Sequence, residues 1–253
     1  MTLALRHTAS LTTRQLLALW RQPWFVAITV VQPLIWLLLF GALFQRVVEL
    51  PGFHGSSYVE FLTPGVLVMS ALFSAGWHGM GYIDAMERGV MNRLLVSPMR
   101  RWALSASGFF HSAVVILVQS LVIVAVAFAD GASFSAGTVV AMLLLAVLLG
   151  GAVSALSDAL ALVARQEQTL IGAVQFVVLP ATFLSTGMMA ASLLPDWIHS
   201  VARFNPVEWA VTGARAGGSD WSLVGIHAGL LVALLLGCAW LATRALRVYQ
   251  RSI

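Results

Sequence analysis

ERGVMNRLLVSPMRR, residues 87–101, lies between two apolar runs of membrane-spanning length, roughly 59–83 and 104–128. Charged residues make up only 9% of the chain, so the charges of this stretch are concentrated. Met86, Val90 and Leu94 recur at helical spacing and give the charged stretch an apolar stripe. The pattern predicts a short helix on the cytoplasmic side of two membrane spans, where a soluble partner can dock.

The composition of the whole chain is that of a membrane protein. Hydrophobic residues make up 60% of its 253 residues and the mean hydropathy is +0.91, whereas about a quarter of an ordinary soluble domain is charged. Hydrocarbon cannot satisfy free backbone groups, so each apolar run of about 20 residues should be helical. The short alternating segments of a β-barrel are absent from the sequence. We expect one all-α transmembrane domain over residues 1–253.

Six spans account for the apolar runs. An amphipathic helix over roughly 8–22 should lie at the membrane interface before the first span. Pro33 and Pro180 fall inside the first and fifth runs, where they should bend the helices. The six predicted spans cover roughly residues 25–44, 59–83, 104–128, 138–163, 169–189 and 223–241.

The arginines orient these spans. Cytoplasmic loops of membrane proteins carry an excess of basic residues. With the N-terminus inside, eleven arginines fall on the cytoplasmic side and three outside. We therefore expect both termini in the cytoplasm. The inner arginines are Arg6, Arg14, Arg21, Arg88, Arg93, Arg100, Arg101, Arg165, Arg244, Arg247 and Arg251, and the outer ones are Arg46, Arg203 and Arg215.

Several kinds of chemistry are disfavoured by the sequence. The chain has no lysine, which a Walker A phosphate loop needs beside its glycine-rich turn. Cys238 is the single cysteine, so an intrachain disulfide is excluded. A nucleic-acid partner would need a basic face on a soluble domain, which is missing. Asp158 could be a functional carboxylate inside the membrane, but its place near the cytoplasmic end of its span favours structural pairing with water or Arg165. The span histidines lack metal-ligand spacing, so we expect them to be packing residues: His78, His111 and His227.

Residues 87–101 resemble the coupling-helix region of the ABC type-2 exporter permeases, a family that includes daunorubicin-type drug exporters and O-antigen or teichoic acid exporters. The match consists of Glu87, Arg88 and Gly89, then LLVSP at 94–98, then two arginines. Val90 departs from the small polar residue that the family commonly has after the glycine.

A second region is similar to the same family. It contains FLSTG at 183–187, LPDW at 194–197 and FNPVEW at 204–209, followed by the last apolar run. Common turn signals explain the Asn-Pro and Leu-Pro pairs taken alone. Their order and their place before the last span agree with the family over essentially the whole chain.

The resemblance implies a permease without catalytic residues or metal. Two copies of a separate ATPase subunit would bind ATP and Mg²⁺ and dock on the coupling helix, with Glu87 and Arg88 at its start. A second permease, identical or a sibling, would complete the pore in a bacterial cytoplasmic membrane. A re-entrant helix pair would line the exit on the outer side. The implied coupling residues are Asp84, Glu87, Arg88, Gly89, Asn92, Leu95, Ser97 and Pro98, and the hairpin residues are Leu194, Pro195, Trp197, Asn205, Pro206 and Trp209.

The cargo divides this interpretation. A drug or other hydrophobic small molecule is favoured because the spans contain almost no interior charge. A lipid-linked polysaccharide is the alternative, with Trp36, Phe40, Phe44 and Trp77 as aromatic surfaces for sugars. From another functional class, a rhomboid-like intramembrane protease would need a Gly-x-Ser-Gly motif, which the sequence lacks. A secondary transporter is disfavoured because no internal repeat is visible.

Overall fold

The computed structural model describes residues 12–13, 23–46, 57–91, 101–188 and 195–251. Within these residues the secondary structure is helical, with no strand, which confirms the predicted all-α class. The described helices are α2 (Pro23–Leu43), α3 (Tyr58–Gly76), α4 (Met80–Glu87), α6 (Arg101–Ala129), α7 (Ala136–Ala164), α8 (Glu167–Phe183), α9 (Asp196–Ala202), α10 (Pro206–Ala216) and α11 (Trp221–Arg251).

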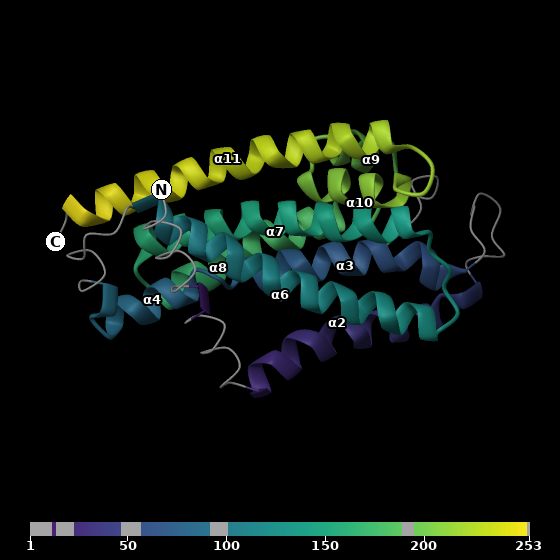
Figure 1. Cartoon of the computed structure of the whole chain (residues 1–253), viewed down its shortest axis with the longest axis horizontal. Helices are drawn as coiled ribbons and strands as arrows, with labels where there is room; N and C mark the ends of the chain where they lie inside the picture. Colours follow the sequence, from purple (N-terminus) through teal and green to yellow (C-terminus); the bar gives the residue numbers. More distant parts are fainter. Residues whose placement is uncertain (1–11, 14–22, 47–56, 92–100, 189–194, 252–253) are drawn as a thin grey trace.

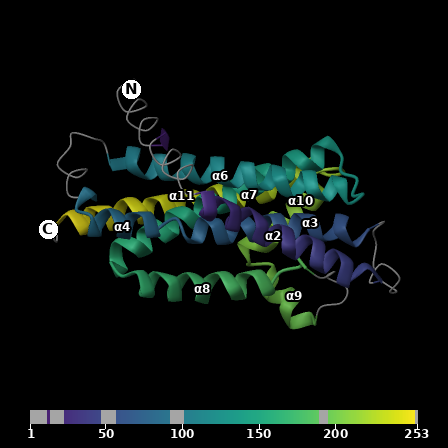
Figure 2. The ribbon, with the colours of Figure 1, turned by 90° about the horizontal axis from the view of Figure 1, so that it is seen from below.

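Helix α7 lies at the centre of an elongated bundle. It contacts α11 on one side and α3 and α6 on the other, while α2 lies beyond α3 and α6 (Figure 1). Helix α8 lies along another side of the bundle, with α9 near its end (Figure 2). The small residues of α7 allow this close packing: Gly150 faces Ile116 of α6, and a Cβ at Gly150 would overlap that side chain.

The two ends of the bundle differ in what they contain. The end with α4 also holds the α7–α8 turn and the C-terminal turn of α11 (Figure 1). We call it the α4 end. The opposite end holds α9, α10 and the first turn of α11, and we call it the hairpin end (Figure 1). Among the described residues, the arginines predicted inside and outside lie toward the α4 end and the hairpin end, respectively.

Four helical segments are long and apolar enough to cross a membrane: Tyr58–Glu87, Ala106–Ala129, Ala136–Ala164 and Trp221–Arg251. The apolar stretch of α2, Ala27–Leu43, is shorter, and α8 has 17 residues. At 1.5 Å per residue, 17 residues span about 26 Å, less than the roughly 30 Å of hydrocarbon. The first and fifth spans therefore remain predictions. The outside of the bundle is apolar, as shown by Phe176, which is 81% exposed.

Candidate functional site

The α4 end presents an exposed ion pair. Arg88 Nε donates to Asp84 Oδ1 at 2.7 Å, and the two side chains are 72% and 55% exposed. The pair has the i, i+4 spacing that brings two side chains to one side of a helical turn. Gly89 follows with a φ of 66°, a left-handed conformation that glycine adopts without strain, so the helix ends here.

The position of Glu87 in its helix differs from the expectation. Glu87 is the last residue of α4 and Arg88 is its C-cap, whereas we predicted both at the start of a short helix. The reason is that α4 follows α3 after a short bend and ends at Glu87, instead of beginning there. The other implied coupling residues lie outside the described residues: Asn92, Leu95, Ser97 and Pro98.

A bend separates α3 from α4, and a serine of α7 fills it. The backbone leaves the α3 helix at Trp77, so Gly76 and Gly79 lose regular helical hydrogen bonds there. Ser157 Oγ donates to the Gly76 carbonyl and accepts from the Gly79 amide at 3.0 Å. A Cβ at Gly79 would overlap the Ser157 backbone, so this contact requires glycine. These hydrogen bonds connect the bend at the start of α4 directly to the central helix α7.

His78 in the bend and Asp158 on α7 form a buried pair. His78 Nδ1 lies 2.7 Å from Asp158 Oδ1, and the two side chains are 9% and 5% exposed. The prediction that Asp158 pairs with Arg165 or water is wrong. The bend places the His78 side chain next to Asp158, which pairs with it instead. The Arg165 guanidinium instead lies 4.7 Å from the ring centre of Tyr249 on α11.

The other span histidines lie in packed positions. The His111 ring centre is 5.4 Å from that of His78, and His227 Nδ1 lies 3.0 Å from the Leu223 carbonyl on its own helix. Within the described part of the chain, no group of three or more potential ligands could hold a metal ion.

The hairpin end is built on Asn205. Its Oδ1 accepts from the Val207 amide at 3.0 Å and so caps the start of α10, with Pro206 as the first helical residue. Its Nδ2 donates to the carbonyls of Ala181 and Leu184 at 2.6 and 2.8 Å. One side chain thus joins the end of α8 to the start of α10.

The remaining implied hairpin residues lie around α9. Pro195 is the N-cap of α9, and Trp197 on that helix is 62% exposed. Trp209 Nε1 donates to the Arg203 carbonyl at 2.7 Å across the α9–α10 turn. Leu194 lies outside the described residues. The structure has two short helices, α9 and α10, joined by a turn here, while a re-entrant pair on the outer side of a membrane remains a prediction.

Glu208 accepts three hydrogen bonds at this end. Its carboxylate accepts from the amide and hydroxyl of Thr186, at 2.7 and 2.9 Å, and from the Thr212 hydroxyl at 2.8 Å. Glu208 lies in the first turn of α10, where the helix dipole favours a negative charge. The FLSTG motif is therefore held against α10 by a carboxylate.

Arg215 completes the network, one turn beyond Thr212. It donates to the Thr186 hydroxyl and carbonyl, at 3.2 and 3.0 Å, and to the Phe61 carbonyl of α3 at 3.2 Å. Its guanidinium carbon lies 3.9 Å from the Phe61 ring centre. Burial lowers the pKa of Arg215 to about 10, against the opposing charge of Glu208, so it stays protonated at neutral pH.

The sequence argument did not select Glu208 or Arg215 as site residues. A signal was present: residues 208, 212 and 215 follow i, i+4 and i+7 spacing, so three polar residues share one face of a helix. The close approach of Gly65 to Gly187 was also not visible. A Cβ at Gly65 would overlap the Gly187 carbonyl, which lets the turn after α8 lie directly on α3.

The chain is similar in sequence to several transport permeases. The chain is 27% identical over 213 residues to ycf38, a transport permease of Porphyra purpurea, covering 83% of this chain and 73% of the relative. It is 28% identical over 193 residues to the daunorubicin resistance ABC transporter permease protein DrrB1 of Streptomyces coeruleorubidus, covering 74% and 65%. It is 27% identical over 230 residues to the inner membrane transport permease YadH of Escherichia coli K12, covering 83% and 85%.

The family assignment rests on a match over most of the chain. Residues 6–217 match the family described as ABC-2 type transporter. The matched region includes α4, the bend beside it and both helices of the hairpin. The chain therefore belongs to the ABC-2 type transporter family.

Proposed function

We propose that this chain is the membrane subunit of an ATP-driven exporter of hydrophobic small molecules. The observation that carries the proposal is the family match over residues 6–217, together with the similarity to a daunorubicin resistance permease. The family assignment leaves the rhomboid-like protease without support. The chain would do no covalent chemistry itself, and the ATP and Mg²⁺ would be bound by a separate ATPase subunit.

The proposed orientation places the α4 end in the cytoplasm. Arg88, Arg165, Arg244, Arg247 and Arg251 lie toward this end, which agrees with the excess of basic residues in cytoplasmic loops. The hairpin end would then face outward. In this arrangement α2 and α8 are also spans, which gives six spans in all and places both termini in the cytoplasm.

ATPase docking on the α4 end would move α4 relative to the bundle. The α4 end has exposed charged side chains, those of Asp84, Glu87 and Arg88. In a pair of permeases, each α4 end would dock one of the two ATPase subunits. The bend at residues 77–79 marks where α4 departs from α3, and Ser157 connects that bend to α7. A displacement of α4 would therefore reach the central helix through the contacts of the bend with Ser157 and Asp158.

The hairpin would shape the outer exit. Hydrogen bonds made by Asn205 and Glu208 hold α10 against the end of α8 and the turn after it. The bond from Arg215 to the Phe61 carbonyl holds α10 against α3. A rigid hairpin would transmit helix movements to the exit without itself unfolding. A second permease, self or sibling, would face it across the pore.

The small-molecule cargo is favoured over a lipid-linked polysaccharide. The rings of Trp36, Phe40 and Phe44 pack on one another, with successive centres 4.9 and 5.6 Å apart. These tilted contacts are ordinary packing of aromatic side chains and give no specific sign of a sugar-binding surface. The low interior charge of the spans favours a hydrophobic cargo.

Reconstitution tests this function. The chain would be purified with the ATPase encoded beside its gene and placed in proteoliposomes. We expect ATP-dependent movement of a small fluorescent hydrophobic compound, lost when the ATPase carries a substituted Walker A lysine. A stable complex that transports a lipid-linked glycan but no small molecule would contradict the cargo class. Failure of the chain to associate with any ABC ATPase would contradict the function as a whole.

A further inference from the structure

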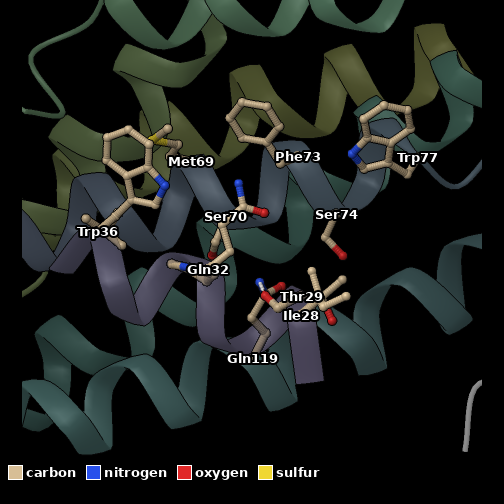
Figure 3. A pocket seen from close by; sticks show the side chains of 12 residues that line it. Ile28, Thr29, Gln32, Trp36, Met69, Ser70, Phe73, Ser74, Trp77 and Gln119 are labelled. Atoms are coloured by element: carbon tan, nitrogen blue, oxygen red, sulfur yellow. Dashed lines mark hydrogen bonds between the residues drawn. The ribbon is translucent and has the colours of Figure 1, made fainter. Parts of the chain in front are cut away.

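A cavity of about 180 Å³ lies inside one chain between α2, α3 and α6 (Figure 3). Trp36 comes from α2, Phe73 from α3 and Trp77 from the bend after α3, and all three lie around the cavity in Figure 3. Ile28 also lines it and is 62% exposed, so the cavity reaches the surface of the bundle beside α2. In a membrane, a ligand could enter here from the lipid.

Gln119 supplies a polar atom that the protein does not use. The residue is 4% exposed, and its Oε1 is buried without a hydrogen-bond partner among the described residues. Gln119 lines the cavity and lies beside Thr29 in Figure 3. A buried amide oxygen without a partner is costly, which makes it a candidate acceptor for a ligand.

The direction of this amide is fixed by its neighbour. Pro33 has no N–H, so it cannot donate to the carbonyl of Thr29 as residue i+4 of a regular helix would. Gln119 Nε2 donates to that carbonyl at 2.6 Å. A carbonyl can only accept, so the nitrogen must face Thr29 and the oxygen must be the atom left over.

The size and walls of the cavity define the chemistry of a ligand. A cavity of about 150 Å³ with apolar walls is known to hold one benzene molecule, so about 180 Å³ suits one ring or two fused rings. Indole and benzene rings in the wall favour a planar aromatic guest. The wall also carries the polar side chains of Thr29, Gln32, Ser70 and Ser74, so water is the competing occupant that an aromatic guest has to displace.

We infer that this cavity is a binding site for a planar aromatic compound of one or two fused rings that carries an N–H or O–H donor. The donor bonds to Gln119 Oε1 and the ring lies among Trp36, Phe73 and Trp77. The inference rests on the proposed function, because it names the cargo class that this permease takes up from the bilayer. The site is contained in one chain and does not require a second permease.

Indole and benzothiophene test the site, because the two have similar shapes and only indole carries an N–H donor. The purified chain in lipid nanodiscs would be titrated with 5-fluoroindole and 5-fluorobenzothiophene, with binding followed by ¹⁹F NMR and empty nanodiscs as the lipid blank. We expect saturable binding of both. Gln119→Leu should weaken indole about tenfold, the size of one hydrogen bond to a buried acceptor, and change benzothiophene by less than about threefold.

Two further variants make the result decisive. Gln119→Met keeps the side-chain length and should give the same selective loss. Gln175→Leu makes the same change on α8, away from the cavity, and should leave both ligands unaffected. Equal weakening of both ligands by Gln119→Leu and Gln119→Met, or no saturable binding above the lipid blank, would overturn the inference.

The binding assay needs neither ATP nor the ATPase, so it fails separately from the proposed function. Intact indole binding without ATP-driven transport would contradict the exporter and leave the site standing. Transport of small molecules without indole binding would contradict the site alone.

Discussion

The hairpin end and the α4 end hold their charged residues in opposite ways. Glu208 and Arg215 are tied to Thr186 and Phe61, so their bonds join α10 to the turn after α8 and to α3. Arg88 and Asp84 belong to one exposed helical turn and bond only to each other among the ion pairs described. At the hairpin end the charged side chains connect separate segments of the chain, whereas at the α4 end they lie at the surface.

This difference assigns the two ends different physical roles. Exposed i, i+4 pairs stabilise a helix by only about 0.3–0.5 kcal/mol, so α4 loses little when its pair is exchanged for a partner's charges. Removing one member of a buried polar network leaves the others without partners, which costs several times more. The hairpin end should therefore respond to mutation through stability, and the α4 end through association.

The largest effect on stability is expected from Glu208→Leu. The change leaves the Thr186 amide and both threonine hydroxyls without their acceptor and removes the charge nearest Arg215. We expect a loss of about 2–4 kcal/mol, below the upper range for buried pairs because Glu208 is partly exposed. Thermal unfolding of the purified chain, followed by size-exclusion chromatography, measures it.

Thr212→Val is the matched control for Glu208→Leu. It removes one of the three hydrogen bonds to the carboxylate and leaves the bonds to Thr186 in place. We expect a loss of about 1 kcal/mol. A Glu208→Leu protein as stable as Thr212→Val would show that the carboxylate does not hold the hairpin.

Arg88→Glu should act on association instead. It places like charges at i and i+4 with Asp84, which costs only a few tenths of a kcal/mol within the helix. At an interface, like-charge juxtaposition typically costs several kcal/mol. We expect a folded, membrane-inserted chain that co-purifies with at least about tenfold less ATPase and does not transport.

Two controls separate the local pair from the interface. Asp84→Arg combined with Arg88→Asp restores an internal pair with reversed order, and it should still bind the ATPase poorly. Arg247→Glu changes an exposed charge on α11 at the same end and should bind nearly normally. Normal ATPase co-purification with Arg88→Glu would remove α4 from the interface.

The sequence predicted the elements that depend on local composition. The long apolar runs became α3, α6, α7 and α11, since span length and hydropathy are properties of consecutive residues. The outer helix pair was implied by the family resemblance alone; the structure has α9 and α10 in this part of the chain, with Asn205 and Pro206 at the start of α10.

The contacts that connect distant segments could not be predicted in the same way. Whether Asp158 meets His78 or Arg165 depends on the bend at residues 77–79. Gly76, Gly79 and Gly81 mark a weak point in the helix, but they do not tell which residue of another helix the bend will face. The role of Gln119 depends on a proline 86 positions earlier (119 − 33), whose missing N–H matters only once α2 lies beside α6. Such pairings follow from helix packing, which residue spacing does not contain.

Ser157→Ala tests the connection between the two ends. It leaves the Gly76 carbonyl and the Gly79 amide without the hydroxyl that bonds both, at an expected cost of about 1–3 kcal/mol. Ser154→Ala is the control, because Ser154 bonds only to the Gly151 carbonyl of its own helix. We expect Ser157→Ala to keep ATPase binding but lower transport per ATP hydrolysed. Equal transport per ATP in the two variants would separate the bend from coupling.

The smallest effect is expected from Trp209→Phe at the hairpin end. The change removes one hydrogen bond, from the indole nitrogen to the Arg203 carbonyl at 2.7 Å, and keeps most of the aromatic surface. That carbonyl lies at an exposed turn where water can replace the indole, so the loss should be about 0.5–1 kcal/mol. Asn205→Ala, which breaks three bonds in a buried position, should cost clearly more. Both variants should retain the ATPase and transport less, in that order. Loss of ATPase from either would place the hairpin at the cytoplasmic interface and reverse the assignment of the two ends.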